Sequence, residues 1–301
     1  MQNNTTFSFE NFTLICGDAL TVMKDLADNS VHLIVTDPPY FLDGMGKEWN
    51  KTKLEKKTSK AKVVGAMPVG MKFSVQDGER FQSFMYDIAK EAIRVLKPGG
   101  FMISFSQARL YGRLAIALEE AGFEMRDMMV WNREGQAKAF GQTHFLEKRL
   151  AKGLINQYQF DVTIQSIGGR KTAQLKPQIE PMTLAQKPRE GTLVDNWLSY
   201  ETGLMDATQS LDGKFPGNLM TVPRPNRAEK GKENDHLTVK PVALIEHIIR
   251  LFSKEGQIVL DPFVGSGSHG VAALLAHRMF IGIDLEPAYI DIALQRMLQV
   301  S

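Results

Sequence analysis

VHLIVTDPPY, at residues 31–40, is the stretch of sequence that decides the fold. Its first part, residues 31–36, is mostly apolar and rich in β-branched side chains, which is typical of a strand buried in a parallel sheet. Asp37 follows directly, at the carboxyl end of that strand, where open α/β sheets bind their ligands. The stretch therefore predicts both a buried strand of a parallel sheet and the place of a ligand site.

The segment from Asp37 to Tyr40 presents an edge rich in hydrogen-bond acceptors. Pro38 and Pro39 end the strand and remove two backbone donors, so the neighbouring carbonyl groups are left free to accept hydrogen bonds. The carboxylate of Asp37 and the flat ring of Tyr40 complete a surface that suits a planar guest bearing an amine. A simple turn at the end of a strand, with no ligand, is the alternative that this segment leaves open.

Helices and strands alternate around this strand up to residue 131. The spacing of apolar residues predicts strands at 12–16, 101–105 and 125–131, and helices at 19–26, 77–96 and 109–121. The segment 97–100, Lys-Pro-Gly-Gly, is expected to stop the helix that precedes it. Such alternation predicts an α/β fold with a doubly wound, Rossmann-like and mostly parallel sheet. Asp18, just after the first strand, is interpreted either as a helix N-cap or as a ligand contact.

A second run of regular structure, residues 239–284, contains a glycine-rich loop. The loop is DPFVGSGS, residues 261–268; the elements predicted around it are a helix at 239–252 with Pro241 in its first turn, a strand at 257–260, a helix at 269–277 and a strand at 279–284. Glycines let the backbone approach a ligand, and a helix N-terminus attracts an anionic group. Asp284, at the end of the last strand, can hold two ribose hydroxyls. Together these features predict a site for a nucleoside cofactor.

Two segments interrupt the alternation and are rich in basic residues. Residues 47–62 contain seven lysines against two glutamates. They are expected to form a mobile loop that is either simply solvated or closes over a polyphosphate chain. Residues 135–235 are rich in Gly, Pro, Gln and Thr, with a helix expected at 143–157 and a returning sheet strand near 180–186. So long an irregular stretch within an α/β domain predicts an inserted functional module rather than a loop.

Bulk composition narrows the class of protein. The chain has 301 residues, 43% of them hydrophobic and 23% charged, which is ordinary for a globular protein. Its net charge of +2 is too small to indicate nucleic-acid binding by itself. The single cysteine, Cys16, excludes an internal disulfide framework and a cysteine-rich zinc site. No apolar stretch is long enough to cross a bilayer, and the first residues are not typical of a signal peptide, so a cytoplasmic location is expected.

Three motifs in a fixed order resemble the beta class of DNA amino-methyltransferases. They are DPPY at 37–40, the run His236-x-Thr238-x-Lys240-Pro241, and DPFVGSG at 261–267. In that family the catalytic motif precedes the S-adenosylmethionine loop, and a target-recognition region lies between them. The resemblance covers residues 12–134 and 236–299. It implies a catalytic part at 1–134 with a mobile loop at 47–66, a target-recognition insert at 135–235, and a donor-binding part at 236–301.

The resemblance also implies a role for each matching residue. Asp37 and the carbonyl group of Pro38 would accept hydrogen bonds from the exocyclic amine of a base swung out of duplex DNA, and Tyr40 would stack on that base. The methyl group would then pass by direct displacement, for which positioning supplies much of the catalysis. The catalytic motif comprises Asp37, Pro38, Pro39 and Tyr40. The residues implied in binding S-adenosylmethionine are Asp18, Thr238, Lys240, Asp261, Phe263, Gly265, Ser266, Gly267 and Asp284.

The target base and the partners follow from the resemblance as well. Asp in the first position of DPPY usually accompanies adenine in the family and Ser more often cytosine, so N6-methyladenine is the expected product and N4-methylcytosine the alternative. Two further alternatives are a relative that binds DNA without catalysis, and an enzyme acting on RNA or on a protein glutamine, which the motif order and the basic insert disfavour. Double-stranded DNA is the expected partner, whereas a homodimer and a cognate restriction endonuclease stay open.

His236 is interpreted either as a local structural hydrogen-bonder or as a ligand contact, and no metal has a predicted part in the chemistry. No cluster of ligating residues has the spacing of a metal site, so no catalytic metal is expected. His269 and His277 are placed on the helix after the glycine-rich loop and are interpreted as structural or exposed.

Overall fold

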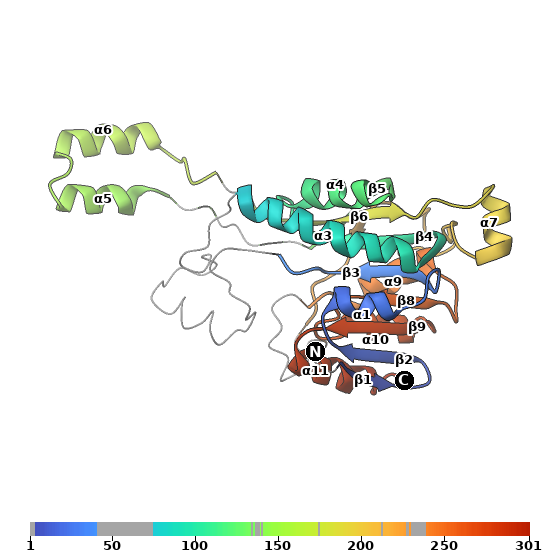
Figure 1. Ribbon diagram of the computed structural model, residues 1–301. Coiled ribbons are helices and arrows are strands. Elements are labelled where there is room, and N and C mark those ends of the chain that lie inside the picture. Colours follow the sequence, from blue (N-terminus) through green and yellow to red (C-terminus); the bar gives the residue numbers. More distant parts are fainter. Residues whose placement is uncertain are drawn as a thin grey trace.

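The computed structural model describes residues 4–40, 75–133, 141–173, 175–211, 213–226 and 239–301, together with the single residues 135, 139 and 229. The described strands form one nine-stranded sheet (Figure 1). In their order across the sheet they are β1 (Thr5–Ser8), β2 (Phe12–Cys16), β9 (Met279–Asp284), β8 (Ile258–Asp261), β3 (Val31–Thr36), β4 (Leu96–Phe105), β6 (Ile179–Gln186), β5 (Glu124–Asn132) and β7 (Leu219–Thr221). The apolar stretch at 31–36 is thus a strand between two parallel neighbours, as predicted, and it lies at the centre of the sheet.

The sheet is mixed. Neighbouring strands are parallel from β2 through β9, β8 and β3 to β4, and again between β5 and β7. β1 runs antiparallel to β2, and β6 runs antiparallel to both of its neighbours, β4 and β5. The predicted α/β sheet is confirmed, and β6 is the returning strand expected near 180–186. Because β6 runs in the opposite direction, its first residues lie at the edge where the parallel strands end.

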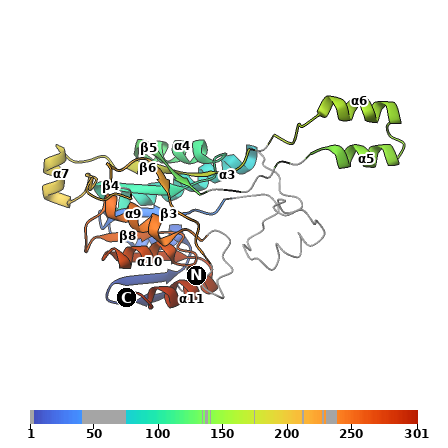
Figure 2. The ribbon, with the colours of Figure 1, turned by 180° about the vertical axis from the view of Figure 1, so that it is seen from behind.

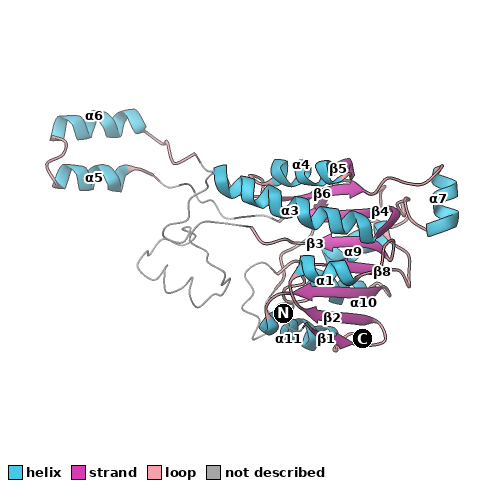
Figure 3. Ribbon diagram, viewed as in Figure 1, coloured by secondary structure: helices cyan, strands magenta, loops and turns pink. Residues whose placement is uncertain are grey.

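Helices cover both faces of the sheet (Figures 1 and 3). One face carries α1 (Ala19–Asp25), α3 (Val75–Val95) and α4 (Tyr111–Ala121). The other carries α9 (Val242–Phe252), α10 (Ser268–Leu275) and α11 (Pro287–Met297), which come forward in Figure 2. The remaining helices are α5 (Thr143–Ala151), α6 (Gln157–Ile167) and α7 (Leu193–Tyr200). Across the described ranges, no helix combines the length and the apolar character that crossing a membrane requires.

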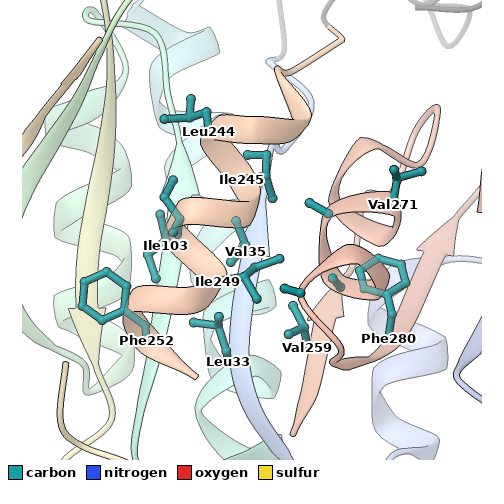
Figure 4. Packing of buried hydrophobic residues seen from close by; sticks show 14 of the residues in the cluster. Leu33, Val35, Ile103, Leu244, Ile245, Ile249, Phe252, Val259, Val271 and Phe280 are labelled. Atoms are coloured by element: carbon teal, nitrogen blue, oxygen red, sulfur yellow. The ribbon is translucent and has the colours of Figure 1, made fainter. Parts of the chain in front are cut away.

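Alternate side chains of the central strand enter two separate cores. Leu33 and Val35 point toward the face covered by α9, where they pack with Ile245 and Ile249 (Figure 4). Ile34 belongs to the opposite core, which is built with α1, α3 and α4. Since these strand side chains are fully buried, β3 is apolar on both faces, which explains its continuous apolar run.

Several element boundaries differ from the predictions. α3 ends at Val95, so the helix stops where predicted, but β4 begins at Leu96 and includes residues 97–100, whereas the strand was predicted from 101. The helix predicted at 143–157 is two helices, because Asn156 caps a second helix, α6, with its side chain. Pro241 is the N-cap residue of α9 and does not lie in its first turn. His277 lies beyond the end of α10, with a φ of 60°, and not within the helix.

α5 and α6 form a helical hairpin, here called the helical arm, that extends away from the sheet in both views (Figures 1 and 2). Within these two helices no side chain is buried. The arm is inserted between β5 and β6, whose residues Asn132 and Ile179 are register partners in the sheet. The insert predicted at residues 135–235 therefore supplies two strands of the sheet, β6 and β7, and also the helical arm outside the sheet.

Candidate active site

Four aspartates stand at the ends of four neighbouring parallel strands. Asp284 and Asp261 are the last residues of β9 and β8, Asp37 follows β3, and Asp18 lies shortly after β2. Because these strands are adjacent and parallel, their carboxyl ends meet at one edge of the sheet. The structure thus brings to one edge the acids that the sequence predicted for catalysis and for donor binding.

Asp284 fastens the glycine-rich loop to the sheet. Its carboxylate accepts hydrogen bonds from the backbone amides of Gly265, at 2.8 Å, and Glu286, at 2.9 Å. Burial raises the pKa of Asp284 to about 6, although these two hydrogen bonds favour a lower value. A carboxyl group with a pKa raised this far, beside a glycine-rich loop, is typical of a functional position.

The loop has a backbone conformation that glycine adopts most readily. The φ angle is 50° at Gly265 and 82° at Gly267. A Cβ atom on Gly267 would lie 2.8 Å from the Cα atom of Ala293 in α11, so the loop rests directly on that helix. Arg296, also in α11, donates to the carbonyl oxygen of Ser266 at 2.5 Å and to its hydroxyl at 3.2 Å. Arg296 was not predicted, because no local motif marks a residue that far from the loop.

Asp261 lies inside the protein and joins the loop to the end of β3. Its fully buried carboxylate accepts from the hydroxyl of Thr36 at 2.7 Å and the amide of Phe263 at 3.0 Å, and it contacts Nδ1 of His269 at 2.5 Å. The His269 ring is stacked with that of Phe105, and Nε2 has no hydrogen-bond partner in the part of the chain that the structure describes. His269 is therefore a buried support of the loop. Direct contact of Asp261 with a donor stays a prediction.

Asp18 is the N-cap residue of α1. One carboxylate oxygen accepts from the backbone amide of Thr21 at 3.0 Å and from its hydroxyl at 2.9 Å. The cap interpretation is confirmed, and a contact with the donor stays a prediction. Phe263 packs against Phe84 of α3, with ring centroids 5.7 Å apart, at the point where the loop leaves β8.

Asp37 is held by a different side chain on each carboxylate oxygen. The hydroxyl of Tyr40 donates to Oδ1 at 3.0 Å, and the ammonium group of Lys240 binds Oδ2. Burial raises the pKa of Tyr40 well above its ordinary value, and the Asp37 carboxylate raises it further, so the phenol stays a proton donor. The Tyr40 ring is 6% exposed and lies against Phe81, with ring centroids 6.1 Å apart. Stacking on a base therefore requires that this ring becomes accessible.

Lys240 lies at the predicted catalytic carboxylate, whereas the resemblance implied a donor contact. Its ammonium group is 3.0 Å from Oε1 of Glu180 and 4.9 Å from the centroid of the Phe105 ring. Burial alone lowers the pKa of Lys240, but the carboxylates of Asp37 and Glu180 outweigh it, so the pKa is raised. Lys240 is thus a buried, charged group shared by two acids. Its contact with a donor stays a prediction.

Glu180 and Arg133 complete this charged cluster of Asp37, Lys240, Glu180 and Arg133. Nη1 of Arg133 lies 2.9 Å from Oε2 of Glu180. Neither residue was predicted as part of the site. The signal for Glu180 in the sequence was weak, since it is only an acid at the start of the strand expected at 180–186. Antiparallel pairing of that strand places its first residues at the edge where Asp37 lies.

The remaining predicted site residues divide into two groups. Pro38 is buried and Pro39 is partly exposed, just beyond the end of β3. Thr238, together with His236 and the lysine-rich loop at 47–66, lies outside the described residues.

The comparison with protein families decides the class of protein. The chain matches the model of the DNA methylase family, N6_N4_Mtase, over residues 31–295, a range that includes Asp37, Glu180, Lys240 and the glycine-rich loop. The chain belongs to the DNA methylase family. The resemblance to DNA amino-methyltransferases is thereby confirmed.

Relatives of this DNA methylase match over nearly its whole length. The type II methyltransferase M.HindIII of Haemophilus influenzae is 29% identical over 308 residues, which cover 93% of each chain. The DNA adenine methyltransferase YhdJ of Escherichia coli is 26% identical over 304 residues, 97% of this chain and 85% of YhdJ. Among solved structures, the cytosine-N4-specific PvuII DNA methyltransferase aligns over 96% of this chain and 87% of its own, with a TM-score of 0.64 and 17% identity. This likeness supports the fold.

Proposed function

We propose that this DNA methylase is a sequence-specific adenine methyltransferase, which transfers a methyl group to the exocyclic N6 amine of an adenine in duplex DNA. The observation that carries the proposal is the position of Asp37. Its carboxylate stands at the end of β3, next to the two strands whose ends hold the glycine-rich loop. An acceptor beside a donor loop suits an amine that must face a methyl group.

The methyl donor is S-adenosylmethionine, which carries its reactive methyl group on a sulfonium. The residues at the edge of β8 and β9 fit such a ligand. The left-handed backbone of Gly267 lets the loop pack directly on Ala293 of α11, and the N-terminus of α10 favours the carboxylate of a methionine tail. Asp284, at the end of the next strand, is placed to accept hydrogen bonds from ribose hydroxyls. Asp18 and Phe263 are assigned to the adenine end of the same ligand.

The catalytic edge acts on the base by orienting its amine. The base leaves the duplex stack, since a methyl donor cannot reach an amine within it. Asp37 and the carbonyl group of Pro38 then each accept a hydrogen bond from the amine. These two hydrogen bonds direct the nitrogen lone pair toward the donor. Tyr40, protonated because its pKa is raised, holds the Asp37 carboxylate in that orientation. Positioning of this kind supplies a large part of the barrier reduction in displacement reactions.

Recognition of the DNA sequence is assigned to the insert at 135–235 and in particular to the helical arm. Lys148, Arg149 and Lys152 are exposed at the end of α5 and just beyond it. Basic side chains on an arm that buries none of its own residues suit contact with phosphates and groove edges. The arm is the part of the insert that is free to reach along a duplex.

The target base is tested directly by product analysis. Unmethylated duplex DNA is incubated with the protein and S-adenosylmethionine, digested to nucleosides and examined by mass spectrometry. N6-methyladenine is the expected product; N4-methylcytosine would replace the proposed base and keep the enzyme class. Donor binding without any methylated nucleoside would instead support a catalytically inactive DNA-binding relative. Single-stranded RNA and a glutamine peptide serve as competing substrates.

A further inference from the structure

Both oxygens of Asp37 are already engaged in this structure. Oδ1 accepts from Tyr40 at 3.0 Å, and Oδ2 binds the ammonium group of Lys240. Under the proposed function, an incoming amine needs one of these oxygens as its acceptor. The stronger competitor is Lys240, because both partners of its bond to Asp37 are charged, whereas the phenol donor is neutral.

Lys240 cannot simply release Asp37 into solvent. Its side chain is 5% exposed, and a buried ammonium group without a carboxylate partner is strongly unfavourable. Glu180 provides such a partner, with Oε1 at 3.0 Å from the same nitrogen. An ammonium group has three donors, so it can be held by both acids at once or by Glu180 alone.

Glu180 is the fixed acid of the two. Its second oxygen, Oε2, is paired with Arg133 at 2.9 Å, and its side chain is 12% exposed. Glu180 also belongs to β6, where Trp131 is its register partner in β5. Asp37 stands beyond the end of its strand, at the first residue of the DPPY turn. The lysine therefore lies between one acid anchored in the sheet and one acid at the reacting edge.

We propose that Glu180 is a positioning residue for methyl transfer, which retains Lys240 so that Asp37 is left available to the target amine. With Glu180 present, the positive charge of Lys240 is divided between two carboxylates, and Asp37 keeps acceptor strength. Without the Glu180 charge, Lys240 is bound by Asp37 alone, and the amine must displace a full ion pair. The inference rests on the proposed role of Asp37 and adds a residue that no motif indicated.

The test is Glu180→Gln, which keeps the shape of the side chain, removes its charge and leaves one acceptor oxygen in place of two. The single-turnover rate of methyl transfer is expected to fall about tenfold or more, while the Kd for S-adenosylmethionine changes less than about twofold. Glu180→Asp, which restores the charge, should recover part of the rate. Glu246→Gln is the matched control, because it removes a carboxylate from another ion pair, with Arg250 in α9, away from the charged cluster.

A double-mutant cycle separates positioning from a general loss of structure. If Glu180 acts through Lys240, the change Glu180→Gln should have little further effect on the rate in a Lys240→Met background. Additive losses in the two variants would overturn the inference, as would a wild-type rate in Glu180→Gln. The unfolding temperature of each variant is compared with that of Glu246→Gln. If Glu180→Gln does not fold, the rate of methyl transfer is measured in Glu180→Asp instead.

The rates are measured for whichever base the wild-type protein methylates. A cytosine product would therefore change the proposed base and leave this test intact. A wild-type protein that methylates neither base would refute the proposed function and this inference together, whereas an active wild type with a fully active Glu180→Gln would refute the inference alone.

Discussion

The proposed donor side and the proposed catalytic side of the sheet edge hold their charged groups by different means. On the donor side, at β2, β8 and β9, each acid accepts a hydrogen bond from a backbone amide: Asp18 from Thr21, Asp261 from Phe263, and Asp284 from Gly265. On the catalytic side, the charged groups are held by other side chains. Asp37, Lys240, Glu180 and Arg133 form a continuous series of ion pairs.

This difference separates a preformed site from one that can rearrange. On the donor side, each carboxylate is bonded to a backbone amide, so its position depends on the backbone of that loop or helix. A lysine shared by two acids can change partner through side-chain rotation alone. Under the proposed function, the donor side is accordingly suited to recognise one constant cofactor, and the catalytic side to admit a base that enters from outside the protein.

The largest effect is expected from Asp37→Ala, which breaks the catalytic side alone. The rate of methyl transfer should fall about 10³-fold or more, because the acceptor that orients the amine is lost. Calorimetry should find the affinity for S-adenosylmethionine within about twofold of wild type, since no donor-side bond involves Asp37. Asp37→Asn keeps one acceptor oxygen and should lose less. An equal loss of donor affinity would show that the two sides are not independent.

Gly267→Ala breaks the donor side instead. The new Cβ atom would lie 2.8 Å from the backbone of Ala293, at a φ of 82°. Crowding and the left-handed backbone together should lower the free energy of unfolding by about 2–4 kcal/mol and weaken donor binding. Chemical denaturation and calorimetry measure the two effects. The control is Gly112→Ala in α4, where nothing lies within 4 Å, and it should be neutral or stabilising by up to about 1 kcal/mol. Equal stability of the two variants would contradict the close packing of the loop.

The pH dependence of donor binding sharpens the comparison further. The pKa of Asp284 is about 6, so its carboxylate is ionised at pH 7.5 and takes up a proton below pH 6. Because the ionised form accepts from ribose hydroxyls, affinity for S-adenosylmethionine should fall as the pH drops through 6, approaching about tenfold per pH unit. The Asp284→Asn variant should bind S-adenosylmethionine weakly, with a Kd that does not change with pH in this range. A wild-type Kd that is constant between pH 5 and 7.5 would contradict the assigned role.

The stability of the ligand-free protein should respond to the same group with the opposite sign. The pKa of Asp284 is higher in the folded protein than its ordinary value of 3.8, so the folded state binds more protons between these two values. Its contribution therefore stabilises the fold as the pH falls from about 6 to about 4. Asp284→Asn should remove this part of the pH profile in thermal unfolding.

The smallest effect is expected from the helical arm, which belongs to neither side. Replacing Lys148, Arg149 and Lys152 by Gln should reduce the slope of log K for DNA against log salt by about 0.9 for each phosphate that is no longer neutralised. The rate of methyl transfer at saturating DNA should change little. Lys24→Gln and Lys90→Gln, at exposed positions of α1 and α3, serve as controls. An unchanged salt slope in the triple variant would place DNA binding elsewhere.

Sequence alone predicted the donor side better than the catalytic side, for a physical reason. Each donor-side acid lies at or just after the end of a strand and accepts from a backbone amide two or three residues further on, Asp18 from Thr21, Asp261 from Phe263 and Asp284 from Glu286, so local pattern is sufficient to place it. Glu180 and Lys240 are 60 residues apart in the chain and meet Asp37 only because β6 returns antiparallel beside β4. The burial of Tyr40 could not be predicted either, since it depends on packing against Phe81 of α3. The helix α6 was missed because its many polar residues obscure the apolar spacing.

If the helical arm recognises DNA as proposed, its insertion point has a consequence for how the specificity of such a protein changes. Asn132 and Ile179 are adjacent across the sheet, so the arm leaves and returns at positions only one strand spacing apart, about 5 Å. β5 and β6 pair as the two strands of a β-hairpin, and the arm takes the place of the turn between them, whatever its length or sequence. Arms of different design can be exchanged at this junction without altering a strand, a core or an acid of the active edge. Under the proposed function, the sheet and its acids stay the same, while the arm assigned to DNA recognition can differ from one such protein to another.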